Sequence, residues 1–362
     1  MKISVVFGTR PEIIKFSPIV RECVRLGLDY FILHTGQHYS YNMDRVFFEE
    51  LELPEARYNL DVGSGSHAEQ TGKMLVGIEK VLQKEKPDVV LVEGDTNTVL
   101  AGALAAVKLG VKVGHVEAGL RSYDDEMPEE INRVLADRCS HFLFAPTEKS
   151  RQILLGEGFS EGKIFVTGNT VVDAVYQNLE VAKKKGSVST RLGLDGQDYF
   201  LVTVHRQENV DNEKRFSGIL EGLKLLQEEF GCKIVYPIHP RAKKQLKVFG
   251  LDANDVLLVE PLNFLGFLQL EANARLVLTD SGGVQEETCI LGVPCVTLRY
   301  NTERPETLEV GSNVLAGTEP KEIVSKAKLM LGKEIKWANP FGDGKAGARI
   351  VDILRKEFGQ IS

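Results

Sequence analysis

The sequence lacks a long hydrophobic run, a leader segment and a low-complexity tail. No apolar stretch approaches the roughly 18 residues that a membrane-spanning helix requires. The first predicted strand begins at Lys2, and no basic and apolar signal segment precedes it. These absences argue against a membrane protein and against a secreted one, so we expect a cytoplasmic location.

Recognisable metal and cofactor motifs are also missing. The five cysteines are odd in number and form no C-x-x-C pair, so we expect reduced and mostly buried thiols. The seven histidines form no H-E-x-x-H motif, and no G-x-G-x-x-G dinucleotide fingerprint is present. The sequence therefore predicts no metal and no cofactor, although dispersed carboxylates stay open as an alternative set of metal ligands.

The composition suits an ordinary α/β protein, with 43% hydrophobic and 26% charged residues. A net charge of −7 argues against a nucleic-acid-binding surface, but it leaves room for a local basic pocket that binds phosphate. A length of 362 residues favours two domains over one.

Short β-branched runs alternate with helical patterns along almost the whole chain. We predict strands at 3–7, 30–34, 88–93, 111–116, 141–145, 163–168, 199–205, 233–239, 256–260, 275–280 and 294–298. We predict helices at 11–27, 68–85, 97–109, 128–138, 147–157, 170–185, 212–230, 282–291, 319–332 and 346–358. This alternation predicts an α/β fold of two Rossmann-like, doubly wound domains that face a cleft.

The polar stretch after the helix near residue 185 is the best candidate for a domain junction. We predict an N-terminal Rossmann-like domain at 1–169 and a C-terminal Rossmann-like domain at 170–352. The last helix, at about 353–362, is expected to pack back on the N-terminal domain.

The stretch "VVFGTRPEIIKFSP" passes from a strand into a helix opened by a proline. Backbone amides at such a helix start favour an anion, and Arg10 and Lys15 would add positive charge. An ordinary strand-to-helix turn with surface Arg and Lys side chains is the alternative.

The stretch "LTDSGGVQEETCILGVP" favours a diphosphate site. Gly282 and Gly283 would let a phosphate approach the backbone, Ser281 could donate its hydroxyl, and Glu287 could accept from sugar hydroxyls. In the alternative, Ser281 only caps the helix. Two glycines at a helix start stabilise little by themselves, so we favour the diphosphate site, to which Arg304 could also contribute.

Several ionisable residues fall at the carboxyl ends of predicted strands, where doubly wound sheets bind ligands. They are Asp95, Glu117, His205, His239 and Asp280. In "VEGDTNTVLAG", Glu93 is expected to be the last outward-facing side chain of its strand, with a structural role. Asp95 could cap the following helix or take part in chemistry, and we favour chemistry.

Eight motifs occur in order along nearly the whole chain: "FGTRPE", "GDTNT", "GHVEAGLRS", "PEEINR", "TGNTVVDA", "YPIHP", "TDSGGVQEE" and "TERPE". Together they closely resemble the non-hydrolysing UDP-N-acetylglucosamine 2-epimerase family. The resemblance implies a glycosyltransferase-B type fold with the active site between the domains. It also implies interconversion of UDP-GlcNAc and UDP-ManNAc through a 2-acetamidoglucal intermediate, by a homodimer without a metal or redox cofactor.

Residue roles follow from the matching motifs. The implied catalytic set is Asp95, Glu117, Glu129 and His205. Glu130 is the alternative to Glu129 in "PEE". The implied UDP-binding set is Arg10, Ser281, Gly282, Gly283, Glu287 and Arg304. We add Lys15 for its charge and Phe267 as a candidate to pack beside the uracil, with a core position as the alternative for Phe267.

Some bacterial members of this family need UDP-GlcNAc as an allosteric activator, and Gln37, His38 and His239 match that region. The residues after His38 depart from the common bacterial pattern, so the form of regulation stays open. Other open alternatives are an epimerase of a related substrate such as a UDP-2,3-diacetamido uronic acid, a hydrolysing variant, a glycosyltransferase of the same fold, and a non-catalytic nucleotide-sugar-binding protein.

Overall fold

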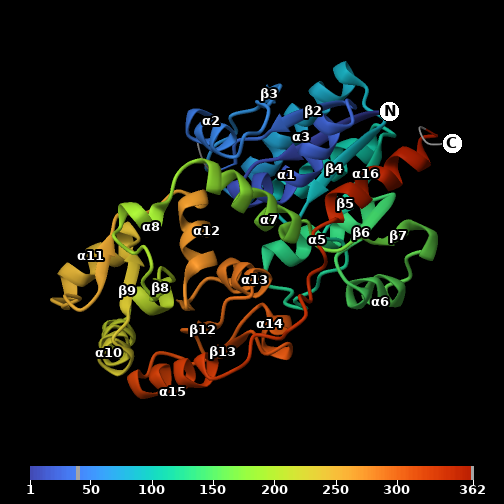
Figure 1. Ribbon diagram of the computed structural model, residues 1–362. Helices are drawn as coiled ribbons and strands as arrows, with labels where there is room; N and C mark the ends of the chain where they lie inside the picture. Colours follow the sequence, from blue (N-terminus) through green and yellow to red (C-terminus); the bar gives the residue numbers. More distant parts are fainter. Residues whose placement is uncertain (38–40, 360–362) are drawn as a thin grey trace. The chain divides into compact units, whose positions relative to one another are not determined.

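The computed structural model describes residues 1–37 and 41–359, which form two compact units (Figure 1). The first unit comprises Met1–Gln177 together with the chain from Phe341 onward, and the second comprises Asn178–Pro340. Each unit is built around one parallel sheet with flanking helices, which confirms the predicted α/β class. The domain boundaries predicted from the sequence stay a prediction.

The first unit contains a 7-stranded sheet in the order β3-β2-β1-β4-β5-β6-β7. Its strands are β1 (Lys2–Phe7), β2 (Asp29–His34), β3 (Tyr58–Asn59), β4 (Val89–Glu93), β5 (Lys112–Val116), β6 (Phe142–Ala145) and β7 (Ile164–Val166). The strand order reverses between β1 and β4, which pair in parallel with Val5 opposite Leu91. This reversal is the topological switch point, where such sheets place their ligands.

The helices of this unit are α1 (Arg10–Arg25), α2 (Tyr41–Glu50), α3 (His67–Glu85), α4 (Asn97–Lys108), α5 (Pro128–Cys139), α6 (Glu148–Gly156), α7 (Thr170–Lys184), which runs on into the second unit, and α16 (Ala346–Glu357), with a short 3-10 turn at Glu161–Lys163. Helix α4 is made of small residues because it lies directly on the sheet. A Cβ at Gly102 would come within 2.9 Å of Val92 Cγ1. This close packing fixes the start of α4 beside the end of β4.

Helix α16 packs against α1 within the first unit. Asp173 accepts hydrogen bonds from the backbone N–H groups of Ala346 at 3.1 Å and Gly347 at 2.9 Å, which satisfies the first amides of α16. A Cβ at Gly347 would lie 2.9 Å from Pro18 Cβ, so glycine permits the close approach of the two helices.

The second unit contains a 6-stranded parallel sheet in the order β10-β9-β8-β11-β12-β13. Its strands are β8 (Tyr199–Thr203), β9 (Lys233–Pro237), β10 (Leu257–Val259), β11 (Leu276–Thr279), β12 (Cys295–Thr297) and β13 (Asn313–Leu315). Its helices are α8 (Val188–Arg191), α9 (Gln207–Val210), α10 (Glu213–Phe230), α11 (Pro240–Phe249), α12 (Phe264–Asn273), α13 (Gly282–Leu291), α14 (Pro305–Glu309) and α15 (Pro320–Leu331). The switch point lies between β8 and β11, where Thr203 pairs with Thr279.

The predicted strands are all present, but the prediction missed β3 and β13 and the helices α2, α8, α9, α11, α12 and α14. All five cysteines are unpaired, and four of them are buried. Within the part of the chain that the structure describes, no helix is both long and apolar enough to cross a membrane.

Candidate functional site

Ionisable residues gather at the carboxyl edge of each sheet, close to its switch point. In the first unit, Glu117 directly follows β5, is 7% exposed, and has a left-handed backbone with φ of 69°. Such a conformation costs a non-glycine residue about 1–3 kcal/mol and is often found where side chains are positioned for function. The Glu117 carboxylate accepts hydrogen bonds from Lys15 Nζ at 2.7 Å and Asn169 Nδ2 at 2.7 Å.

Burial by itself would raise the pKa of Glu117. The charge of Lys15 and the hydrogen bonds from Glu93, Lys15 and Asn169 outweigh burial and lower the pKa of Glu117 to about 2. The surroundings therefore hold this side chain as an anion.

Glu93, the last residue of β4, is only 1% exposed, so the expectation that it faces outward was wrong. Its Oε1 atom lies 3.2 Å from Lys15 Nζ, so Lys15 is shared between Glu93 and Glu117. Burial raises the pKa of Glu93 well above its usual value, the Lys15 charge opposes the rise, and the Glu117 charge adds to it. The two carboxyl groups at the ends of β4 and β5 thus differ sharply in proton affinity.

Asp95 lies two residues beyond β4 and forms an ion pair with Arg133 of α5. Its main-chain carbonyl accepts from Asn132 Nδ2 at 2.9 Å. The N-cap of α4 is Thr96, whose hydroxyl donates to Glu12 Oε1 at 2.7 Å. The Asp95 carboxylate is therefore directed to α5 and is 34% exposed, which leaves part of it accessible to a ligand.

Glu129 and Glu130, adjacent at the start of α5, have different surroundings. Glu130 is buried and accepts from the Ser122 backbone N–H at 2.8 Å, from the Ser122 hydroxyl at 2.9 Å and from the Tyr123 N–H at 3.1 Å. Burial raises the pKa of Glu130, but these hydrogen bonds outweigh burial and lower it. Glu130 thus holds the preceding loop, whereas Glu129 is partly exposed. These surroundings favour Glu129 as the residue available for chemistry.

A carboxyl group of the protein itself, that of Glu12, occupies the turn before α1, and burial raises its pKa against the opposing effect of its hydrogen bonds. Glu12 is buried and accepts from the N–H of Gly8 at 2.9 Å and from the N–H and hydroxyl of Thr9, each at 2.7 Å. Glu12 thus occupies the two amides that immediately precede α1. Arg10 stays a candidate through its side chain, which lies over the Phe47 ring at 5.8 Å.

His115 belongs to a buried structural network. Its Nδ1 lies 2.6 Å from Asp137 Oδ1, and its Nε2 lies 2.8 Å from the Gly94 carbonyl. Burial lowers the pKa of His115, but the charge and hydrogen bond of Asp137 outweigh burial and raise it. Arg121 pairs with the other Asp137 oxygen at 2.7 Å. The network fixes the backbone between β4 and Asp95.

The three candidate allosteric residues differ in what the structure says of them. Gln37 is 5% exposed, and its Oε1 accepts from the Thr98 hydroxyl at 2.9 Å, which ties this loop to α4. His38 lies outside the described residues. His239 caps α11, accepting from the Arg241 N–H at 3.2 Å. Its pKa is lowered, first by burial and then by the neighbouring charges.

In the second unit, Asp280 organises the cluster at the ends of β8 and β11. It is fully buried and accepts from the backbone N–H groups of His205 at 3.1 Å and Arg206 at 3.0 Å and from Asn209 Nδ2 at 3.1 Å. Asp280 Oδ1 also lies 3.2 Å from His205 Nδ1. This contact favours the tautomer with hydrogen on Nδ1, leaving Nε2 of the 41% exposed His205 side chain for a ligand. The His239 ring lies 6.0 Å from the His205 ring.

The glycines after Asp280 leave open space. A Cβ at Gly282 would meet only Glu303 Oε2 at 3.6 Å, and one at Gly283 only Ser281 Oγ at 4.0 Å. Neither glycine has a left-handed backbone. The packing of the described residues therefore does not require glycine at either position. Ser281 is the N-cap of α13 but makes no side-chain cap, which disfavours the purely structural alternative.

Two acidic residues on α13 have separate partners. Glu286 is buried and pairs with Arg304 Nε at 2.8 Å, which anchors the arginine beside α13. Burial, with a contribution from Glu286 and against the opposing effect of Glu271 of α12, raises the pKa of Glu287 to about 7. A raised pKa of this kind in a cluster of polar groups is typical of functional sites. Phe267 is partly exposed and packs against the hydrophobic core of this unit.

Sequence reasoning missed several residues that hold these clusters. In the first unit these are Glu12 and Asn169, although Asn169 lies within the motif "TGNTVVDA". In the second unit, Arg299 pairs with Glu208 at 3.0 Å and with Glu303 at 2.7 Å and so fixes the loop before Arg304.

Within residues 1–37 and 41–359, no three His, Cys, Asp or Glu side chains are arranged to hold a metal ion.

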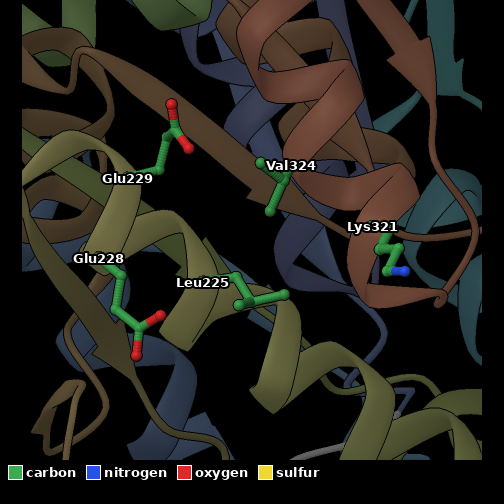
Figure 2. A pocket seen from close by; sticks show the side chains of 5 residues that line it. All are labelled: Leu225, Glu228, Glu229, Lys321 and Val324. Carbon is green, nitrogen blue, oxygen red and sulfur yellow. The ribbon is translucent and has the colours of Figure 1, made fainter.

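A hollow on the second unit lies away from these residues. Figure 2 shows its lining, which comes from α10 and α15: Leu225, Glu228, Glu229, Lys321 and Val324. None of these was predicted as a site residue, and Glu229 is paired with Lys328 at 2.7 Å. We assign no function to the hollow.

Comparisons with known proteins give a consistent result. A protein-family model described as UDP-N-acetylglucosamine 2-epimerase matches residues 22–355. A UDP-N-acetylglucosamine 2-epimerase from Methanocaldococcus jannaschii is 58% identical over 361 residues, covering 98% of this chain and 99% of the relative. A UDP-2,3-diacetamido-2,3-dideoxy-D-glucuronate 2-epimerase from Pseudomonas aeruginosa is 43% identical over 361 residues, covering 98% and 100% of the two chains.

A similar solved structure has ligands bound. The crystal structure of Methanocaldococcus jannaschii UDP-GlcNAc 2-epimerase in complex with UDP-GlcNAc and UDP has a TM-score of 0.84 and 58% identity to this chain, covering 98% of this chain and 100% of that one.

Proposed function

Because the chain belongs to the UDP-N-acetylglucosamine 2-epimerase family, we propose that it interconverts UDP-GlcNAc and UDP-ManNAc. The observation that carries this proposal is the 58% identity, over 98% of the chain, to a protein of that name. The fold supports the same proposal, because similar solved structures are UDP-GlcNAc 2-epimerases.

The chemistry explains why acids and a histidine are needed. The proton on C2 has no adjacent carbonyl, so its direct removal would leave an unstabilised carbanion. If the bond between C1 and the phosphate oxygen breaks first, UDP leaves with the electron pair and the C2 proton becomes acidic. A base then removes that proton and a C1=C2 double bond forms, giving 2-acetamidoglucal and UDP. Return of a proton to the opposite face of C2, with re-addition of UDP at C1, inverts C2.

In this proposal the carboxylates of the first unit act on the sugar. Asp95, Glu117 and Glu129 are the candidates for the two C2 proton transfers and for stabilising positive charge at C1. The anionic state of Glu117, held by Lys15 and Asn169, suits either charge stabilisation or proton removal. The partial exposure of Asp95 and Glu129 supports their access to substrate.

The second unit supplies the groups for UDP. In the imidazolium form, which the Asp280 carboxylate facing Nδ1–H stabilises, His205 could donate its Nε2 proton to the departing diphosphate and be left with hydrogen on Nδ1 alone. The open space at Gly282 and Gly283 and the start of α13 suit a diphosphate. Ser281, Glu287, Arg304 and, from the first unit, Arg10 complete the proposed nucleotide-binding residues, with Phe267 beside the uracil.

A second substrate is favoured by one specific comparison, the 43% identity to an epimerase of a UDP-2,3-diacetamido uronic acid. Both substrates share the UDP group and the C2 chemistry, so the same residues would serve either one. Incubating the enzyme with each UDP-sugar separately and following product formation by NMR distinguishes them. We expect turnover of UDP-GlcNAc. Its absence, with turnover of the uronic acid derivative, would overturn the substrate assignment but not the reaction type.

The same NMR experiment tests the remaining alternatives. Stoichiometric accumulation of free UDP with ManNAc would indicate a hydrolysing enzyme, and transfer of the sugar to an acceptor would indicate a glycosyltransferase. Binding of UDP-GlcNAc without any turnover would indicate a nucleotide-sugar-binding protein.

We also propose that the enzyme is a homodimer in the cytoplasm, where nucleotide sugars are made, and that UDP-GlcNAc activates it. Gln37, His38 and His239 are the candidate contacts of the activator. Light scattering tests the dimer. Starting the reaction from UDP-ManNAc alone tests activation, because a lag that added UDP-GlcNAc removes is expected. Its absence would contradict activation.

A further inference from the structure

Two buried carboxyl groups share a single lysine in the first unit. Lys15 Nζ lies 2.7 Å from Glu117 Oε2 and 3.2 Å from Glu93 Oε1. The side chains of Glu117 and Glu93 are 6% and 2% exposed. Two buried carboxylates beside one ammonium group would leave a negative charge without a matching cation, which favours one proton on the pair.

The surrounding donors indicate which carboxyl group holds the proton. Both oxygens of Glu117 accept, one from Lys15 Nζ and the other from Asn169 Nδ2. Glu93 Oε1 is buried and receives no hydrogen bond from any described residue. An oxygen that receives no hydrogen bond is the better placed of the two to carry hydrogen and donate it.

The other charged groups nearby support the same assignment. Besides Lys15 and Glu117, Glu93 faces the Glu12 carboxyl group of α1, whose charge would oppose a second anion here. The His115 ring of β5 lies near Glu117, but its two nitrogens contact the Asp137 carboxylate and the Gly94 carbonyl. One lysine is thus the only cation among the described groups that directly contact the pair.

We propose that Glu93 is a positioning residue for Glu117: it holds the proton of the buried pair, donates it in a hydrogen bond to Glu117, and so leaves Glu117 as the ionised member of the pair beside Lys15. This inference rests on the proposed epimerase function, in which Glu117 acts on the sugar. It assigns Glu93 a part in that reaction without contact to the substrate. The raised pKa of Glu93 and the lowered pKa of Glu117 agree with it.

Ionisation of Glu93 would end this arrangement. Two anions would then compete for Lys15, and Glu117 would lose a hydrogen-bond donor. Activity should therefore fall on the alkaline side as Glu93 loses its proton. A glutamine at position 93 can donate to Glu117 through its amide and face Lys15 with its oxygen, yet it cannot ionise.

The test compares the full-length enzyme with Glu93→Gln, Glu93→Ala and the control Glu85→Gln. Glu85 is a buried residue of the same unit whose pKa is lowered to about 2, mainly by its hydrogen bonds with Lys2 and Tyr58, so it is ionised. Infrared spectra of protein with ¹³C-labelled glutamate report the carbonyl band of a protonated carboxyl group. Kinetics give kcat/KM from about pH 5 to 9, and thermal melting and UDP calorimetry report folding and binding.

We expect Glu93→Gln to remove one component of the protonated-carboxyl absorption at neutral pH and Glu85→Gln to keep all components, including the one from Glu287, whose pKa is raised to about 7 by burial. Glu93→Gln should retain kcat/KM within about threefold and lose the alkaline limb that tracks the removed component. Glu93→Ala should lose about 10–100-fold, the worth of a hydrogen bond to a charged group.

Protonated-carboxyl absorption that is identical in wild type and Glu93→Gln would overturn the inference, as would an alkaline limb that persists in Glu93→Gln. Equal losses in both Glu93 variants would instead indicate a role in packing alone. If Glu93→Ala does not fold, the band and the Glu93→Gln profile still decide. Because the band does not depend on turnover, a Glu93-dependent component without any epimerisation would refute the proposed function rather than the shared proton.

Discussion

Asp280→Asn is the change that tests most sharply how the second unit prepares His205. The Asp280 carboxylate accepts hydrogen bonds from the backbone N–H groups of His205 at 3.1 Å and Arg206 at 3.0 Å and from Asn209 Nδ2 at 3.1 Å. It also lies 3.2 Å from His205 Nδ1. Asparagine keeps one acceptor oxygen and turns an NH₂ group toward the remaining donors. The change removes a charge-assisted hydrogen bond and leaves a buried donor without a partner.

Two magnitudes follow. Hydrogen bonds to a charged group contribute about 1.5–3 kcal/mol each, so the free energy of unfolding should fall by about 3 kcal/mol. Asparagine would also remove the negative charge that faces Nδ1–H and stabilises the imidazolium form of His205, the form that can donate a proton from Nε2. Proton donation to the departing diphosphate would then be impaired, and kcat should fall about 10²–10⁴-fold, the usual worth of general acid catalysis.

The assays are kcat and KM with UDP-GlcNAc, urea unfolding, UDP calorimetry, and ¹⁵N NMR of the His205 ring. The matched control is His205→Gln, which removes the imidazole but keeps Asp280. We expect both variants to bind UDP within about tenfold of wild type and to lose similar amounts of kcat. A folded Asp280→Asn protein that binds UDP and keeps wild-type kcat would refute the role given to Asp280.

Three further changes test other parts of the two clusters. Lys15→Met removes the cation beside Glu117, so burial would raise the pKa of Glu117, kcat/KM at neutral pH should fall at least about 100-fold, and its acid limb should move to higher pH. An acid limb that does not move would contradict the ion pair. Gly283→Ala should leave the free energy of unfolding unchanged or raise it by up to about 1 kcal/mol, because the added Cβ meets no close neighbour, but it should lower the UDP affinity measured by calorimetry about tenfold. An unchanged affinity would argue against a ligand at this turn. The pKa of His115 is raised above its usual 6.5 by Asp137, so the stabilisation from this pair is complete below pH 6.5 and is lost as pH rises through the pKa of the folded state. The free energy of urea unfolding should therefore depend less on pH in that range for His115→Gln than for wild type, and an equal pH dependence would refute the buried ion pair.

The fold was largely predictable because buried parallel strands are continuous apolar runs. "VVLVE" became β4, with every residue buried. The elements that were missed have weak or ambiguous patterns. β13 has only 3 residues, and α12, "FLGFLQLEAN", is apolar on most of its surface, so it shows little periodicity. Helix α11 begins with a proline straight after a predicted strand end, and the prediction placed no helix there.

The grouping of His205 with Asp280 was predictable in outline, since both follow strands of one parallel sheet. What the sequence could not give is how neighbouring acids divide their tasks. Glu129 and Glu130 differ only in which side of α5 they occupy, and the loop at Ser122 determines that Glu130 is structural. Glu93 seemed to face outward because strand alternation alone does not reveal that Lys15 of α1 covers the end of β4.

The central claim is that this chain breaks and remakes the C2–H bond of a UDP-linked N-acetylhexosamine. Incubation with UDP-GlcNAc in deuterated water tests it most directly, with wild type and Asp95→Asn compared by ¹H NMR and mass spectrometry. We predict one deuterium at C2 of UDP-ManNAc, exchange into the remaining UDP-GlcNAc, and strong loss of both in Asp95→Asn. UDP-ManNAc formed without deuterium at C2, or no turnover by a folded wild-type protein that binds UDP-GlcNAc, would contradict the account.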